Sequence, residues 1–180
     1  MTTRRQTLTL LASLPVIAVA GCDGAANGTA DACQPTPLTD EDECTLCGMT
    51  IVNFPGPKGQ ACLRDGALLP FCSTGDLFSW AWQPESAASV VALYVHNLSR
   101  TSWDEPSDAH FMDAEEAWYV AGHDQKGAMG EALAPFSVRE DAKAFAEAHG
   151  GSIFHHDELD WPHLHGDLAD GDPSATRAVI

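Results

Sequence analysis

Hydrophobic and polar positions follow the same order twice along the chain. Each time, two short apolar runs separated by a turn lead into a Pro-Phe pair, Pro70-Phe71 and Pro135-Phe136, and the two pairs stand 65 residues apart. A serine and a helix-like pattern follow each pair, and a β-branched or aromatic run follows each helix. The repeat predicts an α+β fold built from two tandem ββαβ units.

In the first unit, the apolar runs 60–63 and 67–69 flank a turn sequence that ends in glycine, which predicts a hairpin. A helix is expected over residues 74–83, because a serine precedes it and a proline follows it. The β-branched run 90–95 then predicts a strand.

The second unit repeats this order with a longer first loop. The apolar runs 117–120 and 132–134 flank a glycine-containing loop, and a strand is expected over 152–154. Between them, Ser137 begins a Ser-x-x-Glu capping box, so a helix is predicted over 138–149, where two glycines end it.

The two ends of the chain lack this pattern. Residues 1–21 combine an arginine pair, an apolar run too short to span a bilayer and a small-residue cleavage site before Cys22, which indicates an export signal. The cleavage site resembles a bacterial lipobox, so we expect lipid attachment at Cys22 and anchoring on the periplasmic side of the cell membrane. The expected parts are a signal peptide over 1–21, a flexible tether over 22–43, the first ββαβ unit over 44–98, a linker and second ββαβ unit over 99–156, and an acidic, histidine-containing disordered tail over 157–180.

Charge narrows the possible partners. The 180 residues carry 26 acidic and 9 basic side chains, a formal net charge of −17, and removal of the signal with its two arginines takes this to −19. Such a chain repels nucleic acid and attracts cations and basic protein surfaces. No nucleophile elbow, phosphate-binding glycine loop or paired metal histidines on a helix occurs, so no enzyme activity is predicted.

The chemistry concentrates in the sequence Cys44-Thr45-Leu46-Cys47-Gly48-Met49. A thiolate and a thioether on either side of a glycine can turn toward one ion, and soft sulfur ligands favour copper(I). Two sulfur atoms leave copper(I) short of ligands, and Met129, flanked by glycines in a loop of the second unit, is expected to supply a third. Whether Cys44 or His123 joins the site stays open.

Other interpretations of the cysteines stay open as well. A zinc site would require a second pair of ligands at a matching spacing. Outside the cytoplasm, a disulfide can join Cys44 to Cys47, or Cys62 to Cys72, which flank the predicted hairpin and are expected to face each other. Nothing local assigns a partner to Cys33.

Histidines gather towards the C-terminus. Five of the eight lie in the last 32 residues, and His155, His156, His163 and His165 stand among acidic residues. They could hold a divalent ion, or they could belong to a solvated acidic tail.

Several motifs together resemble the NosL family, the nitrous oxide reductase accessory lipoproteins. The matching stretches are Cys44-x-x-Cys47-Gly48-Met49, residues 55–60, residues 71–85, residues 113–120, Met129-Gly130 with Pro135-Phe136, and His149-Gly150-Gly151. Their order and spacing cover about residues 40–155, and the lipobox cysteine fits too.

The resemblance implies a copper(I) chaperone that is lipid-anchored on the periplasmic side and delivers copper for assembly of nitrous oxide reductase. It implies docking to an ABC-type transporter complex with a periplasmic β-helical subunit. By the same similarity, Cys47 and Met49 would be ligands from the first unit, and Met129 would close the site from the second.

The alternative is a thiol-dependent enzyme on the same fold, either an oxidoreductase or a protein similar to organomercury lyases. Such an enzyme would use Cys44 and Cys47 and would require a carboxylate beside the thiols for proton delivery. The neighbours in sequence are Asp42 and Glu43.

Overall fold

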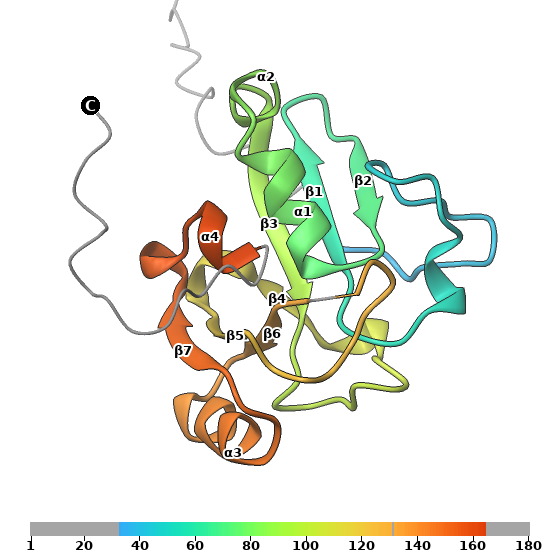
Figure 1. The fold of residues 1–180 in the computed structure, drawn as a ribbon. Helices are drawn as coiled ribbons and strands as arrows, with labels where there is room; N and C mark the ends of the chain where they lie inside the picture. Colours follow the sequence, from blue (N-terminus) through green and yellow to red (C-terminus); the bar gives the residue numbers. More distant parts are fainter. Residues whose placement is uncertain (1–32, 131, 165–180) are drawn as a thin grey trace, which may run out of the picture.

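A computed structural model of the protein describes residues 33–130 and 132–164 (Figure 1). They form two antiparallel sheets, one four-stranded with the order β2-β1-β3-β4 and one three-stranded with the order β6-β5-β7. The strands are β1 Gly59–Leu63, β2 Leu68–Phe71, β3 Val90–His96, β4 Phe111–Asp113, β5 Trp118–Ala121, β6 Ala134–Phe136 and β7 Ser152–His155. The α-helices are α1 Thr74–Ala81, α2 Pro84–Ala87, α3 Arg139–His149 and α4 Trp161–Leu164, and the short 3-10 helices are η1 Ile51–Asn53, η2 Asp108–His110, η3 Ala114–Glu116 and η4 His156–Glu158.

The two tandem ββαβ units are confirmed, with the same strand pairing in each. The first strand of each unit, β1 or β5, pairs with both later strands of its unit. Phe71 lies opposite Gly59 and Phe136 lies opposite Trp118, so the two Pro-Phe pairs occupy equivalent positions. Both prolines lie in edge strands, β2 and β6, where a missing backbone donor is tolerated.

The units share a core because successive side chains of β5 point to opposite faces. Tyr119 belongs to the core cluster of the first unit and contacts Phe78 of α1 with their rings edge to face at 5.5 Å. Val120, next along the strand, instead packs with Phe136 and with Ala142 of α3. The first unit is therefore held against the second by apolar packing, and α3 covers the other side of the second sheet (Figure 1).

The helix limits agree with the sequence at one cap and differ at the other. The backbone N–H of Asp76 donates to Ser73 Oγ at 3.0 Å, so the predicted start of α1 is confirmed. The predicted Ser137 cap of α3 is wrong, because Ser137 Oγ accepts a 2.9 Å hydrogen bond from Asn97 Nδ2. Helix α3 instead begins after Val138, which makes no side-chain cap.

The segment predicted to be a flexible tether is packed on the domain from Cys33 onward. A disulfide joins Cys33 to Cys62 of β1, and Tyr94 Oη donates to the Cys33 carbonyl. The backbone N–H of Leu38 donates to Asp108 Oδ2 at 2.9 Å. Residues 33–43 thus belong to the folded part, whereas the predicted signal peptide and the lipid-attachment residue Cys22 lie outside the described residues.

The Cys62–Cys72 pair expected from the hairpin does not form. In the β1–β2 register, Cys62 pairs with Leu68 and Gly59 pairs with Phe71, so Cys72 follows the far end of the hairpin. Each strand residue advances by about 3.3 Å, which separates the two cysteines by several residues along the sheet. Spacing in sequence was therefore a poor guide to which thiols meet.

The tail expected to be disordered from residue 157 is ordered over its first eight residues, 157–164. Leu164 of α4 belongs to the first core cluster, and Trp161 packs edge to face on Trp82 with ring centroids 5.8 Å apart. The rest of the predicted tail lies outside the described residues. No helix within the described ranges is long and apolar enough to cross a bilayer.

Candidate metal centre

A closed turn presents the first two thiols. The backbone N–H of Cys44 donates to the Met49 carbonyl at 2.9 Å, and the N–H of Gly48 donates back to the Cys44 carbonyl at 2.8 Å. Gly48 has φ +72°, a left-handed conformation that a side chain disfavours, and this allows the chain to reverse between Cys47 and Met49. We call residues 44–49 the sulfur loop.

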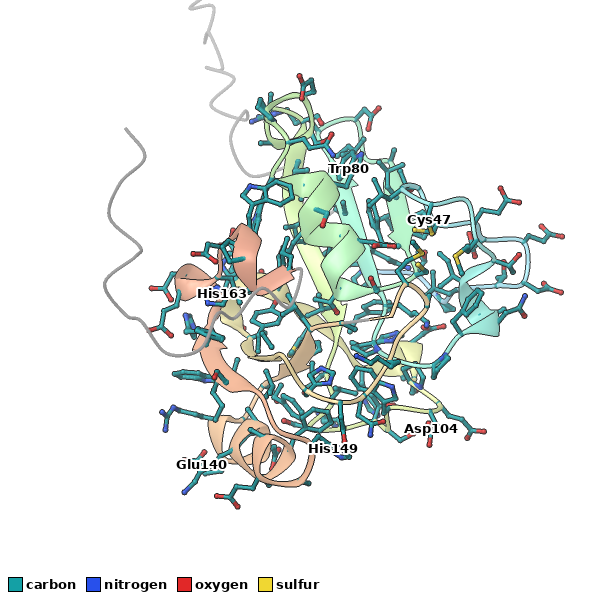
Figure 2. All side chains as sticks on the ribbon, in the orientation of Figure 1. Cys47, Trp80, Asp104, Glu140, His149 and His163 are labelled. Atoms are coloured by element: carbon teal, nitrogen blue, oxygen red, sulfur yellow. A yellow bond between two sulfur atoms is a disulfide. The ribbon has the colours of Figure 1, made fainter. Side chains whose placement is uncertain are left out.

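The sulfur loop lies against the edge of the first sheet and brings its thiols to Cys72. The N–H of Thr45 donates to the Pro70 carbonyl of β2 at 2.9 Å. Cys47 Sγ lies 3.5 Å from Cys72 Sγ, close to the end of β2 (Figure 2). Two short contacts then link the thiols to the first turn of α1, because Asp76 Oδ2 lies 3.0 Å from Cys72 Sγ and 3.6 Å from Cys44 Sγ.

These four side chains form the thiol cluster, Cys44, Cys47, Cys72 and Asp76. Their donor atoms all lie within 4.8 Å of one another. Cys44 and Cys72 are 3% and 0% exposed, whereas Cys47 is only partly buried. The cluster is therefore sealed on the side of the core and accessible at Cys47.

The thiols hold their protons unequally. A hydrogen bond from the Cys72 thiol lowers the pKa of Cys44 to about 5, against the opposing effect of burial. The pKa of Cys72 is raised far above its ordinary range, first because Cys72 donates to Cys44 and then because it is buried beside Asp76. Burial also raises the pKa of Cys47. The cluster thus favours ionisation of Cys44 over Cys47 and Cys72, and a thiophilic cation that bound there would displace the protons still held by the thiols.

The donor distances suit a single ion. A metal–sulfur bond of about 2.3 Å places sulfur ligands roughly 3.8 Å apart around a tetrahedral ion, close to the 3.5 Å between Cys47 and Cys72. Three thiolates are suitable ligands for copper(I). The added oxygen of Asp76 makes the full set equally suitable for zinc, which binds both sulfur and carboxylate oxygen.

The two predicted thioether ligands lie on accessible segments. Met49 ends the sulfur loop and is half-buried, and Met129 is 57% exposed. The β5–β6 loop that carries Met129 is held by a hydrogen bond from Trp103 Nε1 to the Lys126 carbonyl, and its Ala128 packs on the core cluster that includes the thiols. This loop reaches from the second unit towards the end of β2 (Figure 1). Both methionines stay predicted ligands.

His123 lies inside the second unit. Its ring is 5% exposed and sits edge to face between Trp103 and Phe145, at 5.0 and 5.1 Å. Burial lowers its pKa to about 4, so it is neutral at physiological pH. This aromatic environment makes His123 a packing residue of the loop base.

Two of the C-terminal histidines, His155 and His163, are each paired with an acid. His155 Nδ1 lies 2.7 Å from Asp157, and His163 Nδ1 lies 2.8 Å from Asp160. The thiol cluster is the one group of three or more metal-ligating side chains found among residues 33–130 and 132–164. The divalent site considered for the tail is thus not assembled there, and His165 lies outside the described residues.

Sequence reasoning missed Cys72 and Asp76. The available signal was the Ser73 cap, which places Asp76 in the first turn of α1 and Cys72 immediately before that turn, where the two side chains meet at 3.0 Å. Cys72 had instead been matched with Cys62 across the hairpin.

Comparisons with known proteins agree with one another. The NosL family model matches residues 35–164. The copper-binding lipoprotein NosL of Stutzerimonas stutzeri is 42% identical over 176 residues, which cover 94% of this chain and 92% of that protein. The copper-binding lipoprotein NosL of Achromobacter cycloclastes is 36% identical over 123 residues, 66% of this chain and 64% of that one. The crystal structure of the copper chaperone NosL from Shewanella denitrificans has a TM-score of 0.69 and 45% identity, and covers 70% of this chain and 95% of that chain.

Proposed function

This chain belongs to the NosL family, and we propose that it is a membrane-anchored periplasmic chaperone that delivers copper(I) for assembly of nitrous oxide reductase. The observation that carries the proposal is the thiol cluster, in which three sulfur atoms and one carboxylate oxygen lie within 4.8 Å of one another. The relatives named as copper-binding and as a copper chaperone support the same metal.

Within this proposal, Cys47, Met49 and Met129 bind the copper(I). Cys47 is the thiol that faces outward, and Met49 follows it across a glycine in the left-handed conformation. Met129 would enter from the β5–β6 loop of the second unit, whose Ala128 packs on the same core cluster to which Cys44 and Cys72 belong. A site of one thiolate and two thioethers has a low charge and soft donors throughout, which suits copper(I) better than divalent ions.

The same arrangement explains how copper could leave. A chaperone must hold its ion tightly and still let an acceptor's ligand attack it. Buried thiols at Cys44 and Cys72 protect one side of the ion, while the exposed thioether of Met129 and the partly buried Cys47 leave the other side open. An incoming ligand can thus bind before Cys47 dissociates.

The anchor and the partners follow from the same proposal. A lipid on Cys22 would hold the folded part at the membrane, and the relatives named as lipoproteins support this. The acceptor would be nitrous oxide reductase, reached through an ABC-type transporter complex with a periplasmic β-helical subunit. The strong negative charge of the chain favours basic surfaces on these partners.

Anaerobic copper(I) titration against a chromophoric chelator tests the proposal on the chain without residues 1–21. One copper(I) per chain is expected, with a sulfur-dominated first shell in X-ray absorption. Cys47→Ser, Met49→Leu and Met129→Leu should each weaken binding, whereas Met112→Leu, in β4, is a matched methionine control and should not. If Cys47→Ser and Met49→Leu bind copper(I) as tightly as the parent, the ligand assignment is wrong.

One observation favours a second candidate, a thiol-dependent enzyme. That alternative required a carboxylate beside the thiols, and Asp76 is hydrogen-bonded to Cys72 at 3.0 Å, where sequence had pointed to Asp42 and Glu43. An enzyme would release many product molecules per chain from an organomercurial or a disulfide substrate. Reaction that stops at one equivalent would leave the chaperone proposal as the better account.

A further inference from the structure

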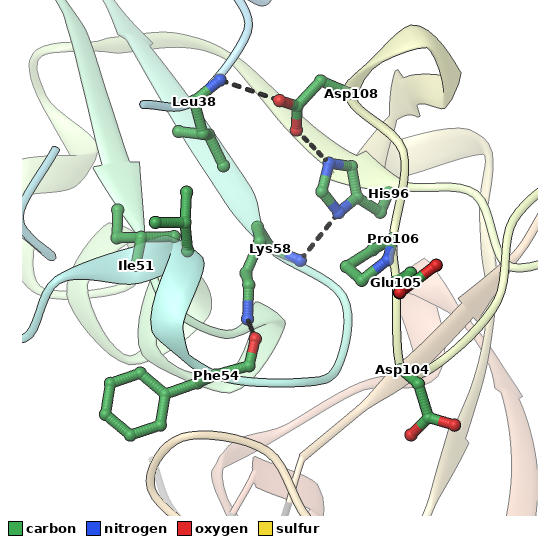
Figure 3. Close-up of a pocket in the computed structure, with 10 residues that line it drawn as sticks. Leu38, Ile51, Phe54, Lys58, His96, Asp104, Glu105, Pro106 and Asp108 are labelled. Carbon is green, nitrogen blue, oxygen red and sulfur yellow. Dashed lines mark hydrogen bonds and ion pairs between the residues drawn. The ribbon is translucent and has the colours of Figure 1, made fainter. Parts of the chain in front are cut away.

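A pocket of about 190 Å³ is lined on one side by residues that follow the sulfur loop in sequence and on another by the segment 104–108 (Figure 3). Its walls include Leu38, Phe54 and Pro106, and also Ile51 and Val52, which lie only two and three residues after Met49. Val52 is 46% exposed, so its side chain is accessible to an occupant of the pocket. We call this cavity the Val52 pocket.

The polar groups inside the Val52 pocket already have partners. Lys58 Nζ donates to the carbonyls of Phe54 and Pro55 at 2.7 and 3.0 Å. His96 accepts from the Lys58 backbone N–H on one ring nitrogen and contacts Asp108 at 2.9 Å through the other (Figure 3). The polar groups inside therefore need no partner from an occupant, and the walls formed by Leu38, Ile51, Val52, Phe54 and Pro106 favour an aliphatic side chain.

The mouth of the pocket is negatively charged. Asp104 and Glu105 both line it and both are exposed. Among the described residues, neither carboxylate accepts a hydrogen bond or forms an ion pair. Two adjacent unpaired negative charges at the rim of the pocket favour a cation that stays outside while the aliphatic side chain beside it enters.

We propose that the Val52 pocket is a docking site for a partner protein segment that inserts an aliphatic side chain and places a neighbouring lysine or arginine on Asp104 and Glu105. The volume suits one side chain rather than a drug-sized ligand. A basic residue next to an aliphatic anchor matches both the rim and the net charge of −17. Buried apolar anchors with a charged rim are typical of protein docking sites.

The position of the pocket indicates how docking could assist copper delivery. This step of the proposal rests on the copper-delivery function proposed above. The wall formed by Ile51 and Val52 continues directly from the sulfur loop, and the N–H of Ile51 donates to the carbonyl of Asp42 just before that loop. A segment seated in the pocket would place its own protein against residues that directly follow the sulfur loop, in which Cys47 is the accessible thiol.

Nuclear magnetic resonance titration of the metal-free chain without residues 1–21 tests the docking directly. The probe is the peptide acetyl-Gly-Leu-Arg-Gly-amide, and its Leu-Gln analogue is the uncharged reference. Saturable shifts are expected at the methyl groups of Leu38, Ile51 and Val52, with weaker binding at higher salt. The Asp104→Asn/Glu105→Gln variant should bind the arginine peptide roughly fivefold more weakly, as expected for the loss of two exposed ion pairs.

The control variant is Glu85→Gln/Glu116→Gln, which removes two exposed carboxylates that do not line the pocket and should bind like the parent. Equal binding of the two peptides, or no saturable shift at the wall residues, would overturn the proposal. Butylammonium binding as tightly as the arginine peptide would overturn it too, in favour of a small amine ligand. Copper(I) affinity of the Asp104→Asn/Glu105→Gln variant should match the parent, so failure of docking and failure of copper binding are read separately.

Discussion

Removal of the Cys33–Cys62 disulfide should destabilise the fold by an amount set by the length of the loop it closes. The two cysteines are 29 residues apart in sequence. The chain-entropy relation for a loop of this length gives about 3.5 kcal/mol at room temperature. The Cys33→Ser/Cys62→Ser variant should lose about this much free energy of unfolding, a large share of the total for a domain of this size.

The native contacts of the segment should survive in this variant, because they do not depend on the disulfide. Gln60 Nε2 donates to the Thr36 carbonyl at 2.7 Å, and the Thr36 N–H donates to Gln60 Oε1 at 3.0 Å. The backbone N–H of Leu38 also keeps its hydrogen bond to Asp108 Oδ2. The loss of unfolding free energy should therefore arise mainly from the less constrained unfolded state, and the circular dichroism spectrum of the native variant should match that of the parent.

Equilibrium urea unfolding of the metal-free protein under nitrogen measures the effect. With a slope of about 2 kcal/mol per M, the midpoint should fall by roughly 1.5–2 M. The double variant avoids a single free thiol that could exchange with the thiol cluster. With a strong reductant present, the parent should unfold at the midpoint of the variant. A difference below about 1 kcal/mol without reductant would refute the reasoning, because the bond would then place little constraint on the unfolded chain.

Three further predictions follow from single positions. Cys72→Ala removes the hydrogen bond that lowers the pKa of Cys44 to about 5, so this pKa should rise towards its ordinary range. The ultraviolet absorbance of the thiolate at neutral pH should then fall. Unchanged absorbance would contradict the assignment of the lowered pKa to the Cys72 hydrogen bond. Gly151→Ala should cost about 4 kcal/mol in thermal or urea unfolding, because φ is +94° and a Cβ would also lie 2.5 Å from the Ala121 carbonyl oxygen, whereas Gly150→Ala, with a glycine-only backbone (φ +78°, ψ −171°) but open space for the Cβ, should cost about 2 kcal/mol. Equal costs would show that the close approach is relieved by a backbone shift. Burial lowers the pKa of Lys58 from 10.5 to about 8, so between these pH values the unfolded chain binds more protons than the folded one and the free energy of unfolding should rise with pH. Lys58→Met should reduce this rise by up to about 3 kcal/mol in urea unfolding measured across the pH window. Parallel plots of unfolding free energy against pH for parent and variant would contradict the pKa shift.

The fold was predictable because its signals are local. Each Pro-Phe pair lies in a hairpin and is followed by a serine and a helix. Phe71 and Phe136 occupy equivalent positions in their hairpins, opposite Gly59 and Trp118, so the repeat in sequence is also a repeat in structure. Where a distant residue intervenes, the local signal fails. Ser137 has the sequence of a helix cap, yet Asn97, forty residues earlier, takes its hydroxyl.

The site was predictable only in part, for the same reason. Cys47 was found because its neighbours in sequence carry the chemistry. The partners of Cys33 and Cys72 depend on strand register, and a sequence without pairing information cannot supply that register. The hairpin was located correctly, but its register pairs Cys62 with Leu68, which leaves Cys72 beyond the far end of the hairpin and free to join the thiol cluster.

If the thiol cluster takes part in the proposed copper delivery, the burial of Cys44 and Cys72 favours release of copper(I) from one side of the cluster. Cys44 and Cys72 are fixed by the edge of β2 and the first turn of α1, so they cannot follow a departing ion. Cys47 lies in a turn that Gly48 closes, with nothing packed over the glycine, and can move with little cost. Within the proposed function, an acceptor would therefore approach at Cys47, and the Val52 pocket includes Ile51 and Val52, which follow the sulfur loop in sequence. If docking and ligand exchange use the same side of the molecule, loss of the rim carboxylates should slow copper transfer to an acceptor without changing how tightly copper is held.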